Sequence, residues 1–207
     1  MTAGPLRVVV ADDQAMVRGA LAALLDLEPD IEVVAQAGDG RGAVEAVAAG
    51  RPAADVVLMD VEMPVMDGIT ACAAVRARFP EVRVLMLTTF GRPGYVQRAL
   101  DAGATGFVVK DAPSEQLAEA VRRVSRGERV IDPTLAVEAL THGACPLTDR
   151  EVEVLRLVAE GGTIADIAAG IGLGQGTVRN HISSAMTKTG ARTRAEAVRL
   201  ATDAGWM

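Results

Sequence analysis

The sequence predicts a doubly wound α/β domain followed by a smaller all-helical domain, and three observations support this prediction. Four short runs rich in Val, Leu and Met are separated by amphipathic stretches of helical length, as in buried parallel strands that alternate with helices. The 207 residues exceed the common length of one domain. Residues 146–207 carry several helix-start signals instead.

Each apolar run ends at a polar residue. LRVVV precedes Asp12 and Asp13, ADVVLM precedes Asp60, VRVLML precedes Thr88, and GFVV precedes Lys110. Because the carboxyl ends of parallel strands line one crevice, we expect these side chains to share a pocket. A single Asp at the end of a strand is usually only a turn residue. The prediction therefore depends on the coincidence of four strand ends.

The charges of this pocket indicate its chemistry. Three crowded carboxylates favour a hard cation, and Mg²⁺ suits the site because it binds one or two carboxylates, waters and a phosphate. Asp60 would then be a nucleophile that accepts a phosphoryl group, with Thr88 and Lys110 at the phosphoryl oxygens. The sequence thus predicts Mg²⁺ as the cofactor and a phosphate-accepting site, not an enzyme acting on a carbon substrate.

Four motifs over residues 5–127 (DD, MDVEMPVMDG, LTTF and GFVVKDA) resemble those of the receiver domain of two-component response regulators. The resemblance implies a flavodoxin-like, five-stranded parallel sheet of order 2-1-3-4-5. It also implies that a sensor histidine kinase phosphorylates Asp60. Mg²⁺ would be bound by Asp13, Asp60 and the backbone carbonyl of Glu62, and by Asp12 through water.

The same resemblance implies a conformational switch made of Thr88, Phe107 and Lys110. Thr88 would move toward the phosphoryl group that Lys110 contacts, and Phe107 would turn inward behind it. A lone Phe in a strand is, however, more often a plain core residue.

Composition and charge suggest a cytoplasmic protein without membrane insertion. The chain has two cysteines without disulfide or metal spacing, no apolar stretch of the roughly 20 residues that a membrane helix needs, and no signal peptide at its start. Its net charge is −6, yet residues 146–207 hold seven basic and seven acidic residues. Within them, residues 175–199 carry five basic residues against Glu196 alone, which suggests a phosphate-binding stripe or a solvated helix face.

Helix starts in this half are marked by capping pairs. Thr148, Thr163 and Thr193 each precede an acidic residue by three positions, as in a capping box. A further helix is expected over 177–188, with Gly174 as its N-cap. The glycine-containing turn between helices 164–170 and 177–188 is typical of a helix-turn-helix, whose second helix enters the major groove of DNA.

The segments PLTDREVEVLRLVAEG, IADIAAGIGLGQGTVRNHISSAMTKTG and RTRAEAVRLA resemble the LuxR-type DNA-binding domain, and with the receiver they resemble the NarL/FixJ family. TTFGRPGY, GTVRN and the final GW further resemble its lipid-desaturase and envelope-stress regulators. The resemblance implies a double-stranded promoter DNA partner, with base contacts from Arg179, Asn180 and Ser183 and phosphate contacts from Thr177, His181 and Lys188. A structural hydrogen bond is an equal alternative for His181.

The expected organisation is a receiver domain over 1–127, a linker over 128–145 with a short helix at 133–140, and a DNA-binding domain over 146–207. A homodimer is expected after phosphorylation, since the family reads paired half-sites. Two surfaces could form it. The resemblance implies one made of the helices 14–27 and 113–126 in the receiver. The other is the helix 193–204, which is expected to expose Ala197, Leu200 and Ala201 along one side, although these would also be ordinary core residues.

Two other functions fit parts of the sequence. An aspartyl-phosphate phosphatase needs a second acid two residues after its nucleophile, and Glu62 has that place after Asp60. A DNA-binding regulator controlled without phosphorylation would keep the helix-turn-helix and leave the receiver pocket idle. The Asp12–Asp13 pair, Thr88 and the attached helix-turn-helix favour a regulator over the phosphatase. The complete set of pocket residues argues against a regulator whose receiver is unused.

Overall fold

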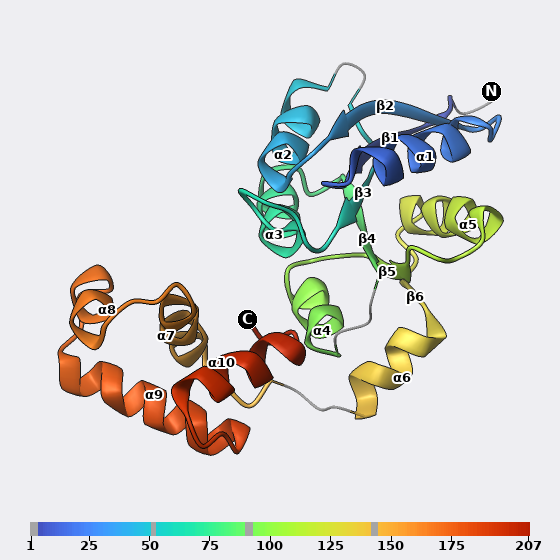
Figure 1. The fold of residues 1–207 in the computed structure, drawn as a ribbon. Coiled ribbons are helices and arrows are strands. Elements are labelled where there is room, and N and C mark those ends of the chain that lie inside the picture. The colour runs from blue at the N-terminus through green and yellow to red at the C-terminus, as the bar shows by residue number, and fades with distance from the viewer. Residues whose placement is uncertain (1–3, 51–52, 90–92, 142–144) are drawn as a thin grey trace. The chain divides into compact units, whose positions relative to one another are not determined.

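The computed structural model describes residues 4–50, 53–89, 93–141 and 145–207. The chain divides into two compact units. The first contains a β-sheet with its surrounding helices, and the second contains helices α7 to α10 (Figure 1). The helix α6 (Pro133–Thr141), which falls at the division, confirms the helix predicted at 133–140. Residues 90–92 of the TTFGRPGY motif lie outside the described residues.

The first unit is a parallel sheet with helices on both faces. Its strands follow the order β2-β1-β3-β4-β5-β6, so the predicted order 2-1-3-4-5 is confirmed, and a sixth strand extends it. The strands are β1 (Leu6–Ala11), β2 (Ile31–Ala37), β3 (Val56–Asp60), β4 (Arg83–Thr88), β5 (Gly106–Val109) and β6 (Val130–Ile131). The helices are α1 (Ala15–Asp26), α2 (Gly40–Ala49), α3 (Gly68–Arg78), α4 (Pro93–Asp101) and α5 (Ser114–Ser125).

The strand β6 was not predicted. It has two residues, which pair in parallel with Gly106 and Phe107 of β5. Such a short strand has no periodic pattern of its own, and only the neighbouring strand makes it part of the sheet. It lies within the segment expected to be a linker.

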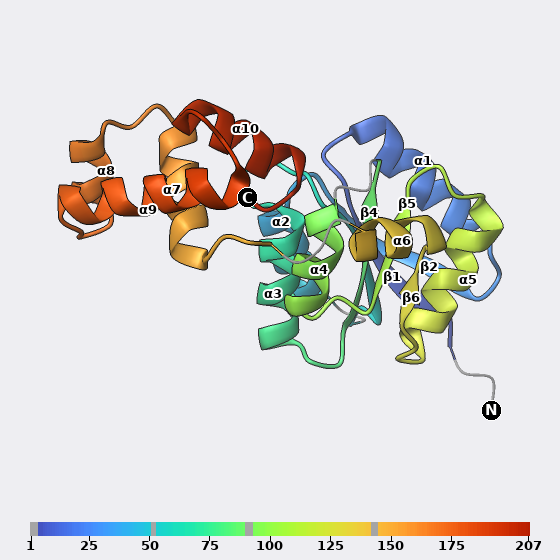
Figure 2. The same cartoon turned by 90° about the horizontal axis from the view of Figure 1, so that it is seen from below.

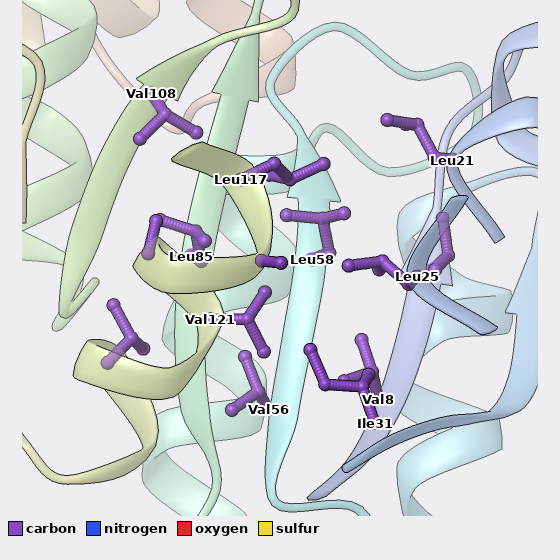
Figure 3. Close-up of a cluster of buried hydrophobic side chains, with 14 of the residues drawn as sticks. Val8, Leu21, Leu25, Ile31, Val56, Leu58, Leu85, Val108, Leu117 and Val121 are labelled. Atoms are coloured by element: carbon purple, nitrogen blue, oxygen red, sulfur yellow. The ribbon is translucent and has the colours of Figure 1, made fainter. Parts of the chain in front are cut away.

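Alternating strand residues form the main core on one face of the sheet. Leu25 of α1 and Val121 of α5 pack there against Val8, Leu58 and Leu85, and all five are at most 1 % exposed (Figure 3). The other face is covered by α2, α3 and α4 (Figure 2). Because both faces are covered, the central strands β3, β4 and β5 are apolar in their interiors, whereas the edge strand β2 exposes Glu32 and Gln36.

The second unit is a four-helix domain made of α7 (Asp149–Ala159), α8 (Ile164–Gly170), α9 (Gln175–Thr189) and α10 (Arg194–Asp203). Thr148 and Thr163 form complete capping boxes, as predicted. At Thr193 the hydroxyl caps the helix, but the Glu196 carboxylate accepts from Arg192 N instead, so this box is a variant. Gly174 is the N-cap of α9, as expected.

The expected exposure of Ala197 and Ala201 on α10 is wrong. Both are fully buried in a cluster with Leu147, Leu155 and Ala185. Small side chains let α10 approach α7 and α9 closely, so these alanines serve the domain core. Among the described residues, no helix is both long and apolar enough to cross a membrane.

Candidate functional site

The strand ends bring the predicted pocket residues to one edge of the sheet. Asp60 and Thr88 are the last residues of β3 and β4, and Asp12 and Lys110 directly follow β1 and β5. One further backbone hydrogen bond holds each of the latter two: Asp12 N donates to Ala37 O at 3.1 Å, and Lys110 N donates to Thr88 O at 2.8 Å. These side chains therefore emerge from rigid backbone.

Lys110 is the centre of the pocket. Its Nζ lies 2.7 Å from Asp12 Oδ2 and 2.8 Å from Asp60 Oδ2, and both carboxylates are buried. Asp12, Asp13 and Asp60 each place a carboxylate oxygen within 4.8 Å of the others. A cavity of about 130 Å³ opens beside them, lined by Asp13, Gln14, Asp60, Glu62, Thr88, Thr89 and Lys110.

The pocket alters the protonation of its charged groups. Burial raises the pKa of Asp60, and the nearby Lys110 ammonium offsets part of this rise. Burial also lowers the pKa of Lys110, but hydrogen bonds to Asp12 and Asp60 outweigh it and hold that pKa above its usual value. Lys110 therefore remains a cation at neutral pH.

The donor set fits a divalent cation. The three clustered carboxylates and one ammonium leave the site with a formal charge of −2. Oxygen ligands on a site partly open to water match the preference of Mg²⁺. The acidic cluster is thus consistent with a metal site.

Of the remaining predicted pocket residues, two line the cavity and one is buried in the sheet. Glu62 is exposed and lines the cavity, and Thr88 lines it with only 4 % exposure. Phe107 is fully buried on β5, paired with Met86 of β4. The cavity residues Gln14 and Thr89 were missed, although each is adjacent in sequence to a predicted residue.

In the helical domain, α9 presents the predicted DNA contacts. Val178 and Ile182 are buried, while Thr177, Arg179, Asn180 and Ser183 are exposed. His181 is half-buried. The two faces follow from the helical repeat, because residues four positions apart, such as Val178 and Ile182, lie on the same side of α9.

Lys188, the last predicted phosphate contact, has an intramolecular partner. Its Nζ lies 2.7 Å from Oε2 of Glu151, which is buried in α7. Glu151 Oε1 accepts from the Ser184 hydroxyl at 2.6 Å, and Oε2 accepts from Thr148 N at 2.7 Å. Sequence reasoning assigned Glu151 to the capping box alone, since no local signal reveals partners 33 and 37 residues away.

The Glu151 carboxylate makes the stability of this domain depend on pH. Burial raises its pKa, but hydrogen bonds from Lys188, Ser184 and Thr148 outweigh that effect and lower the pKa to about 2 from 4.5. Because the pKa is lower in the folded state, the stabilisation is complete above about pH 4.5 and is lost as the pH falls toward 2. A shift of this size corresponds to roughly 3 kcal/mol.

We therefore expect Glu151→Gln to lower the free energy of unfolding by this amount near neutral pH and by much less at about pH 2.5. Urea unfolding of both proteins across this range measures the difference. Glu153→Gln, a change at a half-exposed carboxylate of the same helix, is the control. A difference between wild type and Glu151→Gln that stays constant with pH would contradict the prediction.

Comparison with known proteins gives two family matches. Residues 8–122 match the response regulator receiver domain, and residues 145–201 match the bacterial regulatory proteins of the luxR family. The chain is 44 % identical to the transcriptional regulatory protein DesR of Bacillus subtilis over 97 % of this chain and 98 % of DesR. It is 43 % identical to YvfU of the same organism, over 98 % and 100 % of the two chains. The crystal structure of the response regulator ChrA matches with 32 % identity and a TM-score of 0.59, over 99 % of this chain and 100 % of ChrA.

Proposed function

The chain belongs to the two-component response regulators that join a receiver domain to a LuxR-type DNA-binding domain, and from this premise we propose that phosphorylation of Asp60 controls its binding to promoter DNA. The families are those of regulators and not of enzymes, so the phosphatase alternative is set aside. The observation that carries the proposal is the cluster at the strand ends, where Asp60 lies 2.8 Å from Lys110 and beside two further carboxylates.

In the proposed reaction the Asp60 carboxylate attacks the phosphorus of a phosphohistidine on a sensor kinase. The O–P bond of an aspartyl phosphate forms as the N–P bond breaks, and the histidine leaves as imidazole, which takes its proton from solvent. The Lys110 ammonium, already within 3 Å of the carboxylate, would donate a hydrogen bond to a phosphoryl oxygen. Asp12, Asp13, Asp60 and the backbone carbonyl of Glu62 would hold Mg²⁺. The ion, when bound, would neutralise negative charge between the carboxylates and the phosphoryl oxygens.

The proposed signal passes through Thr88 to Phe107. Thr88 ends β4 and lines the same cavity as Asp60, so a small shift would bring it toward a phosphoryl group on Asp60. Phe107 lies on the adjacent strand and is buried, so a shift of Thr88 would change the space behind its ring. Phosphorylation would act as a shift between two populations of the receiver.

We expect phosphoryl-mimicking beryllium fluoride with Mg²⁺ to strengthen binding of the wild type to a promoter duplex by about tenfold or more, equivalent to about 1.4 kcal/mol. Asp60→Asn should not respond, because it lacks the carboxylate that holds the mimic. Fluorescence anisotropy of a labelled duplex measures both affinities. If Asp60→Asn binds as strongly as the activated wild type, the relay is wrong.

We also propose that activated receivers pair through an apolar face of α1. Met16, Leu24 and Leu27 are 88, 41 and 79 % exposed. Their positions lie on one side of the helix, since they are spaced by eight and three residues. An exposed apolar face of this kind marks an interaction site.

The double variant Met16→Asp with Leu27→Lys should weaken this dimer at least tenfold, or about 1.4 kcal/mol, because it places charges in an apolar interface. Both charges complement the dipole of α1, so the monomer should stay folded. Light scattering with beryllium fluoride and Mg²⁺ measures the oligomeric state. Arg41→Asp, on the first turn of α2, is the matched control, and dimerisation equal to wild type in the double variant would exclude the α1 face.

A further inference from the structure

The carboxylate of Glu151 joins two helices of the DNA-binding domain. It is 4 % exposed and lies in the first turn of α7. Its two oxygens accept hydrogen bonds from Ser184 Oγ and Lys188 Nζ of α9, at 2.6 and 2.7 Å. The donors are four residues apart, so they lie one above the other on the same side of α9.

This pair of bonds constrains the rotation of α9 about its axis. Apolar packing by Val178 and Ile182 holds the helix against the core, but it is non-directional. Hydrogen bonds to a buried carboxylate depend on both distance and angle. The rotation that satisfies Glu151 is the one that leaves Arg179, Asn180 and Ser183 exposed.

The same carboxylate places the Lys188 ammonium at the domain surface. The Lys188 side chain is 34 % exposed, whereas that of Glu151 is 5 % exposed. An ammonium has three donors. Those not directed at Glu151 can reach a phosphate, and the paired side chain has less rotamer freedom to lose when it does so.

We propose that Glu151 is a positioning residue for DNA recognition: it sets the rotation of α9 that aligns the base-reading side chains, and it pre-orders Lys188 for a backbone phosphate of double-stranded DNA. This inference rests on the proposed function, because it assumes that α9 reads DNA. Base contacts need correct alignment, whereas non-specific phosphate contacts tolerate a rotated helix. Loss of Glu151 should therefore reduce specificity more than overall affinity.

The test uses the full chain, activated with beryllium fluoride and Mg²⁺, at a temperature where every variant is folded by circular dichroism. The probes are a duplex recovered by in-vitro selection on the wild type and a duplex of scrambled sequence. Glu151→Gln should lower the ratio of the two affinities about tenfold or more, and Ser184→Ala should lower it in the same direction by less. Glu153→Gln, at the half-exposed partner of Arg150, should leave the ratio unchanged.

Lys188 gives an independent readout. Lys188→Met should weaken binding to both duplexes and reduce the slope of log affinity against log salt by about 1, the change expected for one lost phosphate contact. Lys188→Arg should restore that slope. If Glu151→Gln does not fold, Ser184→Ala, which keeps the ion pair, decides the question through the affinity ratio.

An unchanged affinity ratio in folded Glu151→Gln, or in Ser184→Ala where that variant decides, would overturn the inference and leave Glu151 a purely structural residue. An unchanged salt slope in Lys188→Met would show that Lys188 does not contact a phosphate and would overturn that part of the inference. Both results leave DNA binding by the wild type intact, so they are distinct from failure of the proposed function. Failure of the wild type to select any duplex would reject the proposed function and this inference together.

Discussion

Asp60→Asn is expected to abolish the phosphoryl adduct that the wild-type chain forms with acetyl phosphate and Mg²⁺. The amide has nearly the same shape as the carboxylate, so the pocket should persist, but it lacks the anionic oxygen that attacks phosphorus. Intact-mass spectrometry after incubation measures the adduct directly. The wild type should gain a single phosphoryl group, and the variant should gain none.

Asp101→Asn is the matched control, because it makes the same chemical change at an exposed position of α4. It should be phosphorylated like the wild type. An adduct on Asp60→Asn would assign the reaction to another residue. If the wild type forms no adduct, a repeat with beryllium fluoride distinguishes strict dependence on a kinase from control without phosphorylation, since only a working pocket binds the mimic.

Gly68→Ala should destabilise the receiver more than any other single methyl addition near the site. A Cβ at Gly68 would lie 1.8 Å from the backbone oxygen of Asp60 and 2.9 Å from its carbonyl carbon. Both atoms belong to rigid backbone at the end of β3, and Gly68 N also donates to Val61 O at 2.9 Å. The backbone must move to relieve this overlap, which should lower the free energy of unfolding by about 3 kcal/mol or more.

Urea unfolding of the full chain, followed by circular dichroism, measures this loss. Gly19→Ala is the control, because Gly19 lies within α1 and a Cβ there meets nothing within 4 Å. That change should raise stability by about 0.5 to 1 kcal/mol through the helix propensity of alanine. Equal unfolding midpoints for Gly68→Ala and the wild type would contradict this prediction and show that the backbone at the end of β3 can shift to accommodate the methyl group.

The receiver pocket could be predicted from sequence because the same pattern, an apolar run that ends at a polar residue, recurs along the chain. Four of the strands, β1, β3, β4 and β5, are largely apolar runs that end at or just before a polar residue, so the parallel topology brings Asp12, Asp60 and Lys110 together. The distances of 2.7 and 2.8 Å around Lys110 are the outcome of that arrangement. Gln14 and Thr89 were missed because a cavity wall has no pattern in sequence.

In the helical domain, some features could be predicted from sequence and one could not. Helix starts at Thr148 and Thr163 were predictable, because a cap depends on residues only three positions away. The burial of Ala197 and Ala201 was not, because an alanine fits equally well on a surface and in a close helix contact.

By itself, the sequence determined four of the strands, the helix starts and the residues gathered at the strand ends, since each depends on local pattern or on parallel topology. Only the tertiary structure decided that β6 joins the sheet, that α10 buries its alanines and that Glu151 binds Ser184 and Lys188. The physical reason is that these features are contacts between segments distant in sequence. Their geometry depends on how whole elements pack, and no window of neighbouring residues contains it.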